Sequence, residues 1–87
     1  VQVFYASVDK KNEDIASSIQ SFMNEKLGTD REIKRISNSI YMYSKLDVPG
    51  VLVECGFLSN GAERTKLLDE QYIQQFAQYL ALSLVSI

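Results

Sequence analysis

The most constraining feature of this 87-residue sequence is a continuous apolar run at residues 51–53, which Glu54 and Cys55 follow directly. The turn-forming residues 47–50 precede the run, and Gly56 ends it. An unbroken apolar run between two turns is typical of a strand that is covered on both faces, as in the centre of an α/β sheet. The sequence therefore predicts a central strand over residues 51–55.

Amphipathic helices are predicted before and after this strand in the sequence. The first runs over about residues 12–27, with Asp9 or Asn12 as its cap and Gly28 as its stop. The second runs from about residue 70 to the end and has a wide apolar face, which we expect to pack on a sheet. The stripe on that face is formed by Tyr72, Phe76, Leu80 and Leu84, and is broadened by Ile73, Ala77 and Ile87.

Three shorter elements complete the predicted order of strand, helix, strand, strand, helix, helix. We expect strands over residues 1–6 and 40–45, and a short helix over about 62–69 with Asn60 as its N-cap. The fold class is α/β, with a few-stranded sheet and packed amphipathic helices. Since so short a chain gains little more from burial than it loses in conformational entropy, we expect it to associate with itself or to pack on further sequence.

Composition excludes several classes of function. A hydrophobic content of 46% indicates a folded chain, and no apolar run approaches the ~18 residues of a membrane span. The net charge is −2, and the basic run of residues 26–35 is diluted by acidic residues, so we expect no nucleic-acid surface. The first residues read as the middle of a strand, without a targeting segment, as in a fragment.

Glu54 is the residue that draws attention chemically. Strand alternation places it with Leu52 on the face opposite Val51 and Val53. An unpaired buried carboxylate is costly, so Glu54 must be paired, protonated, or at the strand's end facing a cleft. Spacing alone leaves a structural and a functional role equally open.

Other candidate residues favour ordinary roles. The chain has no histidine to activate its one cysteine, so Cys55 is predicted to be a small buried side chain. Arg31, Lys34 and Arg35 could bind an anionic group, although a solvated surface is the simpler interpretation. The aromatic side chains are predicted to lie in the core; they are Phe4, Tyr5, Tyr41, Tyr43, Tyr72, Phe76 and Tyr79.

Residues 48–60, which read VPGVLVECGFLSN, strongly resemble the signature strand and loop of the zinc-dependent N-acetylmuramoyl-L-alanine amidases called amidase 3. The germination-specific, spore cortex branch is the most similar. The opening Val3 to Ser7, the stretch from Arg31 to Lys34 before residues 41–43, and the run from Leu67 to Tyr72 agree in order. The resemblance covers essentially all 87 residues.

The resemblance implies a peptidoglycan hydrolase of the cell envelope or spore cortex. It cleaves the amide between N-acetylmuramic acid and L-alanine, using zinc held by two histidines and a glutamate. Glu54 matches the family's general base and acid, and Arg31 matches a possible substrate contact. The zinc ligands lie in the N-terminal half of the family's domain, so residues 1–87 correspond to the C-terminal half of a larger three-layer α/β domain without metal ligands.

Two alternatives to an active amidase remain open at this point. The missing ligands and the apolar face of the last helix are also consistent with a non-catalytic association or scaffold module. A catalytically inactive amidase fragment is the intermediate case. The expected partners are peptidoglycan and either the N-terminal half of the domain or a second copy.

Overall fold

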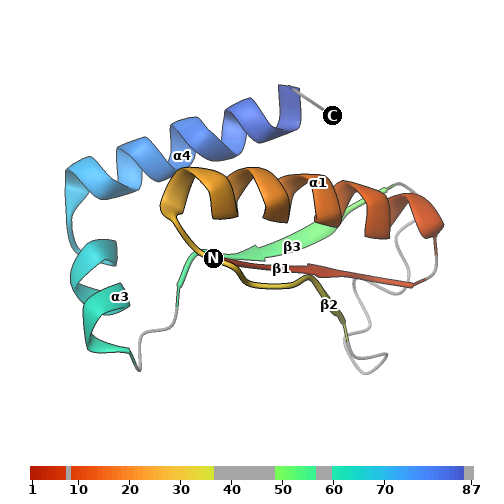
Figure 1. The fold of residues 1–87 in the computed structure, drawn as a ribbon, viewed down its shortest axis with the longest axis horizontal. Coiled ribbons are helices and arrows are strands. Elements are labelled where there is room, and N and C mark those ends of the chain that lie inside the picture. The colour runs from red at the N-terminus through yellow and green to blue at the C-terminus, as the bar shows by residue number, and fades with distance from the viewer. Residues whose placement is uncertain (8, 37–48, 57–59, 86–87) are drawn as a thin grey trace.

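The computed structural model describes residues 1–7, 9–36, 49–56 and 60–85. A helical layer covers one face of a small mixed sheet: α1 lies over the strands, and α4 lies beside α1 on the same side (Figure 1). This arrangement confirms the predicted α/β class. The elements are β1 (Gln2–Tyr5), α1 (Lys10–Leu27), β2 (Lys34–Arg35), β3 (Val51–Glu54), α3 (Gly61–Leu67) and α4 (Glu70–Val85).

The strand order is β2-β1-β3, so β1 is the middle strand of the described sheet. β1 is parallel to β2, with Phe4 opposite Lys34, and antiparallel to β3, with Gln2 opposite Glu54. The prediction that β3 is central and covered on both faces is wrong for the described residues, because β3 lies at the edge and is half-buried throughout. Val51 and Val53 pack on the core, whereas no described helix covers the opposite face.

Both ends of α1 follow from local sequence. Asp9 is the N-cap, and its carboxylate accepts a hydrogen bond from the Lys11 N–H at 2.9 Å. Gly28 closes the helix in the left-handed conformation, with a φ of 68°, and donates its N–H to the Asn24 carbonyl. The helix therefore begins two residues before the predicted start and ends as predicted.

Two buried amides of α1 bind the backbone of the strands. The Gln20 Oε1 atom accepts from the Val3 N–H at 2.8 Å, and its Nε2 atom donates to the Val1 carbonyl at 3.2 Å. Asn12, the alternative cap, instead donates to the Ala6 carbonyl at 3.1 Å and accepts from the Gly50 N–H at 2.9 Å. Gln20 thus substitutes for a neighbouring strand beside β1, and Asn12 ties the end of β1 to the start of β3.

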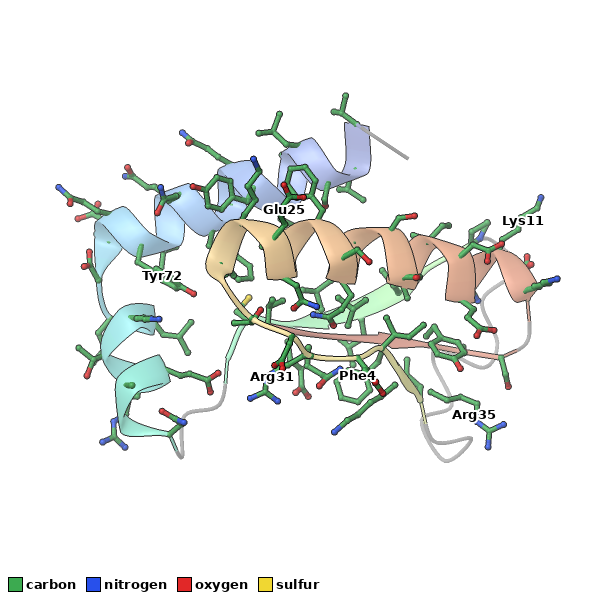
Figure 2. All side chains as sticks on the ribbon, in the orientation of Figure 1. Phe4, Lys11, Glu25, Arg31, Arg35 and Tyr72 are labelled. Atoms are coloured by element: carbon green, nitrogen blue, oxygen red, sulfur yellow. The ribbon has the colours of Figure 1, made fainter. Side chains whose placement is uncertain are left out.

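The core lies between α1 and the sheet and includes one residue of α4. Its buried members are Val1, Val3, Ala16, Ile19, Met23 and Phe76. Of the aromatic residues predicted to be core, Phe76 is buried and Tyr5, Tyr72 and Tyr79 are half-buried against the cluster. Phe4 points to the opposite face of the sheet (Figure 2), while residues 41 and 43 lie outside the described part of the chain.

The apolar face of α4 is covered only in part. Phe76 and Ser83 are buried, but Ile73 and Leu84 are 48% and 54% exposed. We had expected the helix to lie directly on the sheet, but it packs beside α1 (Figure 1). Because its core-facing side is narrower than its apolar surface, a large part of that surface stays in solvent.

β2 was missed in the sequence, and the predicted strand over residues 40–45 lies outside the described residues. Lys34 and Arg35 are both exposed, so β2 has no apolar alternation to reveal it. It is defined by backbone pairing with β1, continued by the Ile36 N–H, which donates to the Tyr5 carbonyl at 2.7 Å.

Replacing Gln20 with methionine should destabilise the fold, because the Val3 N–H and the Val1 carbonyl would lose their buried partner. We expect the free energy of unfolding to fall by about 2–3 kcal/mol, measured by urea denaturation. The matched control is Gln78→Met on the exposed side of α4, which should leave that free energy within about 0.5 kcal/mol of wild type. Equal effects of the two substitutions would contradict the role of Gln20.

Candidate functional site

Glu54 is the last residue of β3, at the end of the sheet. It lies opposite Gln2 in the register and is half-buried. Val51 and Val53 pack toward α1, so alternation directs Glu54 to the other face, as predicted. No described side chain forms a hydrogen bond or an ion pair with the Glu54 carboxylate. Of the three environments open to it, the structure favours the strand end rather than a buried pair.

The backbone around Glu54 is fixed through β1. The side chain of Gln2, which is 2% exposed, donates a hydrogen bond to the Glu32 carbonyl. Gln2 therefore connects the strand position opposite Glu54 to the segment that leads into β2. Glu54 sits at the edge of a sheet whose middle strand is anchored on both sides, by Gln2 in this way and by Gln20 from α1.

The exit from β3 runs closely past α3. A Cβ atom added to Gly56 would lie 3.3 Å from Leu67 Cδ1 and 3.6 Å from Glu63 Cβ. The N-cap of α3 is Asn60, as predicted: its Oδ1 atom accepts from the Ala62 and Glu63 N–H groups at 3.0 and 3.1 Å. A side chain at position 56 would thus press on the helix that follows the signature loop.

Cys55 is exposed, which corrects the prediction of a buried thiol. The prediction rested on the absence of a histidine that could activate the thiol, which says nothing about cover; in the structure the strand has already left the sheet at this residue. Cys55 lines an apolar cavity of about 150 Å³ between the end of β3 and the helices α3 and α4. Burial raises the pKa of the Tyr72 phenol in the same wall, and the Glu63 carboxylate raises it further. The remaining lining residues are Leu67, Ile73 and Phe76.

Arg31, the predicted substrate contact, is half-buried and forms an ion pair with Glu63 of α3, with 3.7 Å between Nη2 and Oε1. Its side chain lies on the side of the sheet away from α1 (Figure 2). It borders a polar cavity of about 340 Å³ formed by α1 and residues 31–33. No hydrogen bond or ion pair joins Arg31 and Glu54 among the described residues, so a shared role in binding substrate stays a prediction. Lys34 and Arg35 are exposed on β2.

Glu63 was not singled out in the sequence. A signal was available, because an asparagine followed three residues later by a glutamate is close to a capping-box pattern. In the structure the backbone of Glu63 meets Asn60, while its side chain turns to Arg31. The capping pattern could have been noticed, but the ion pair with Arg31 could not, because the two residues are far apart in the sequence.

The zinc that the resemblance implies does not fit the donors of this chain. The sequence contains no histidine. In residues 1–7, 9–36, 49–56 and 60–85, no group of three or more Cys, Asp or Glu side chains could hold a metal ion. Residues 1–87 therefore do not supply the family's two histidine ligands.

This chain belongs to the amidase 3 family. The family's sequence profile, described as N-acetylmuramoyl-L-alanine amidase, matches residues 1–86. The germination-specific N-acetylmuramoyl-L-alanine amidase of Bacillus subtilis strain 168 is 39% identical over 77 residues, which are 87% of this chain and 32% of that protein. Another B. subtilis relative, the uncharacterized protein YqiI, is 39% identical over 64 residues, 72% of this chain and 30% of its own length.

Solved structures have the same fold. The CwlD amidase of Clostridioides difficile, in complex with the GerS lipoprotein, matches with a TM-score of 0.87 and 30% identity, over 98% of this chain and 44% of that one. An N-acetylmuramoyl-L-alanine amidase from Clostridium difficile 630 matches with a TM-score of 0.82 and 25% identity, over 98% and 46%. The chain thus spans about a third of its curated relatives and less than half of the solved ones.

Replacing Gly56 with alanine should push α3 away from β3, because the added methyl group approaches Leu67 too closely. We expect a loss of about 1 kcal/mol in the free energy of unfolding, together with faster amide exchange in residues 61–67. Gly61→Ala is the matched control: its Cβ atom would meet nothing nearer than Arg64 Nη2 at 4.0 Å, so neither quantity should worsen. Faster exchange in both variants would contradict a specific close approach at Gly56.

Proposed function

We propose that the protein containing this chain is a peptidoglycan hydrolase that cleaves the amide between N-acetylmuramic acid and L-alanine. The carrying observation is that the family profile matches residues 1–86 and that Glu54 of the signature strand lies, half-buried, at the end of the sheet. Three of the relatives named above are amidases by name. The activity is a proposal because this chain spans only part of each relative.

We assign to Glu54 the transfer of protons during hydrolysis. As general base its carboxylate accepts a proton from the attacking water, and as general acid it returns that proton to the nitrogen of the departing L-alanine. Zinc would be held by ligands that include the two histidines this chain lacks, and when bound it would polarise the carbonyl and make the water more acidic. The location of Glu54 at the end of β3, half-buried and without a partner among the described side chains, suits a carboxylate that must contact a substrate.

We further propose that the protein acts on peptidoglycan at the cell envelope or spore cortex, as the names of the relatives suggest. The predicted contact of Arg31 with a carboxylate of the stem peptide stays a prediction, since its guanidinium is engaged by Glu63 in the structure. No helix among the described residues is long and apolar enough to cross a membrane.

Changing Glu54 to glutamine in the protein that contains this chain should lower kcat by roughly 10²–10⁴-fold, because the amide cannot accept the proton. The measurement is the release of L-alanine amino termini from purified peptidoglycan, with zinc content and unfolding midpoint recorded for each variant. Glu25→Gln is the matched control, because Glu25 is an exposed carboxylate of α1 (Figure 2). Turnover near the wild-type value in Glu54→Gln would refute the proposed role.

A second candidate function, an association module, is favoured by the surface of α4. Residues 71–85 contain no charged side chain, and Ile73, Leu82, Leu84 and Val85 are each about half exposed or more. Exposed apolar surface without charge is typical of the centre of a protein interface. One solved relative is in complex with a lipoprotein, so protein association has a precedent in the family.

If α4 is such an interface, the protein should have a molecular mass above that of a monomer in light scattering. The double substitution Ile73→Glu and Leu84→Glu should then lower the mass to that of a monomer, because two charges would be buried in the contact. Gln74→Glu, on the polar side of the same helix, is the control and should leave the mass unchanged. A wild-type monomer at all concentrations would exclude self-association through α4.

A further inference from the structure

The ion pair between Arg31 and Glu63 joins the segment that leads into β2 to α3, the helix that follows the exit from β3. Arg31 lies in the segment before β2, and Glu63 lies in the first turn of α3. Their side chains are 35% and 24% exposed, so the pair is partly shielded from water. Figure 2 shows Arg31 at the end of the sheet that α3 also approaches. At a separation of 3.7 Å the two groups attract each other as charges, and partial burial reduces the screening of that attraction by water.

On the α3 side, the position of Glu63 is set by the exit from β3. Its N–H donates to Asn60 Oδ1, which caps the helix. Its Cβ atom lies within 3.6 Å of the place where a Gly56 side chain would begin. Glu63 therefore lies where α3 comes close to Gly56, which follows Glu54 by two residues.

On the other side, Arg31 belongs to a segment fixed to both α1 and β1. Its carbonyl accepts a hydrogen bond from Asn24 Nδ2 at 2.8 Å. The next carbonyl, that of Glu32, accepts from the side chain of Gln2, which lies opposite Glu54 in the sheet. The ion pair thus closes a ring of contacts that runs from Glu54 across β1 to Arg31, and back through α3 to Gly56.

We propose that Arg31 is a positioning residue, which acts through Glu63 to hold α3 against the exit from β3 and so fixes the direction of the Glu54 carboxylate. The proposal rests on the proposed function, because it concerns the residue assigned to proton transfer. It gives the guanidinium a role that differs from a direct contact with substrate. A displacement of about 1 Å in a catalytic group can cost up to ~10²-fold in rate, so even a modest restraint has a kinetic effect.

A double-mutant cycle in the active protein tests the proposal. Arg31→Met and Glu63→Gln should each lower kcat by roughly tenfold with little change in KM, because the carboxylate is displaced while substrate binding is kept. The loss in the double variant should be smaller than the product of the two single losses, since both substitutions remove the same pair. The charge swap Arg31→Glu with Glu63→Arg should recover most of the kcat lost in Arg31→Glu alone.

Two exposed residues serve as controls, Lys11→Met and Glu25→Gln, each removing one charge at the surface of α1. Both should leave kcat and KM at wild-type values. The proposal would be overturned if Arg31→Met raised KM while Glu63→Gln behaved as wild type, since Arg31 would then contact substrate directly. Independent, multiplying losses in the double variant would overturn it as well.

Amide hydrogen exchange separates this proposal from the amidase function. Loss of either partner should speed exchange in residues 61–67, whereas Glu54→Gln should not. Unchanged exchange in both Arg31→Met and Glu63→Gln would overturn the positioning role while leaving the amidase function intact. A folded wild-type protein with zinc bound that exposed no new L-alanine amino termini in peptidoglycan would overturn the proposed function, and with it the role of the pair in catalysis.

Discussion

The structure depends on the way α1 satisfies the backbone of β1. β1 is the middle strand, but β2 pairs with it only near Phe4 and Tyr5. The amide of Gln20 takes the place of a strand beside Val1 and Val3, and Asn12 holds the other end of β1 to the start of β3. Because unpaired buried backbone groups are costly, these amides fix where the helix layer lies on the sheet. The apolar core lies between the helix layer and the sheet that these amides hold together.

The candidate site follows from that register. Once β1 and β3 are paired, Glu54 must lie beside Gln2 at the end of the sheet, on the face away from α1. The helix α3 is brought to the same end because Gly56 allows a close approach and Asn60 starts a new helix four residues later. One short stretch of sequence therefore supplies the carboxylate, the glycine that lets α3 approach, and the cap of α3.

Local chemistry made much of this predictable from sequence. The α1 helix, its glycine stop, the Asn60 cap and the face of Glu54 each follow from a few neighbouring residues. The strand β2 was not predictable, because two exposed charged residues carry no pattern and only backbone pairing defines them. The pairing of Arg31 with Glu63 likewise depends on the folded arrangement.

The error about β3 has a physical cause. An apolar run was taken to mean a strand covered on both sides, and the central place of β3 was inferred from it. A run of apolar residues shows that cover is required, but not that the cover lies in the same 87 residues. The incomplete cover of α4 illustrates the same point, since Ile73 and Leu84 are apolar and nevertheless exposed.

The edge position of β3 has a practical consequence for handling the isolated chain. Among the described strands, β3 pairs only with β1, so no described strand occupies the outer row of its backbone N–H and C=O groups. Val51, Leu52 and Val53 carry no charge that would discourage pairing with another extended segment, and natural sheets usually protect an edge with lysine, proline or a bulge. The same strand that presents Glu54 is therefore also the segment through which unassembled copies would begin to aggregate.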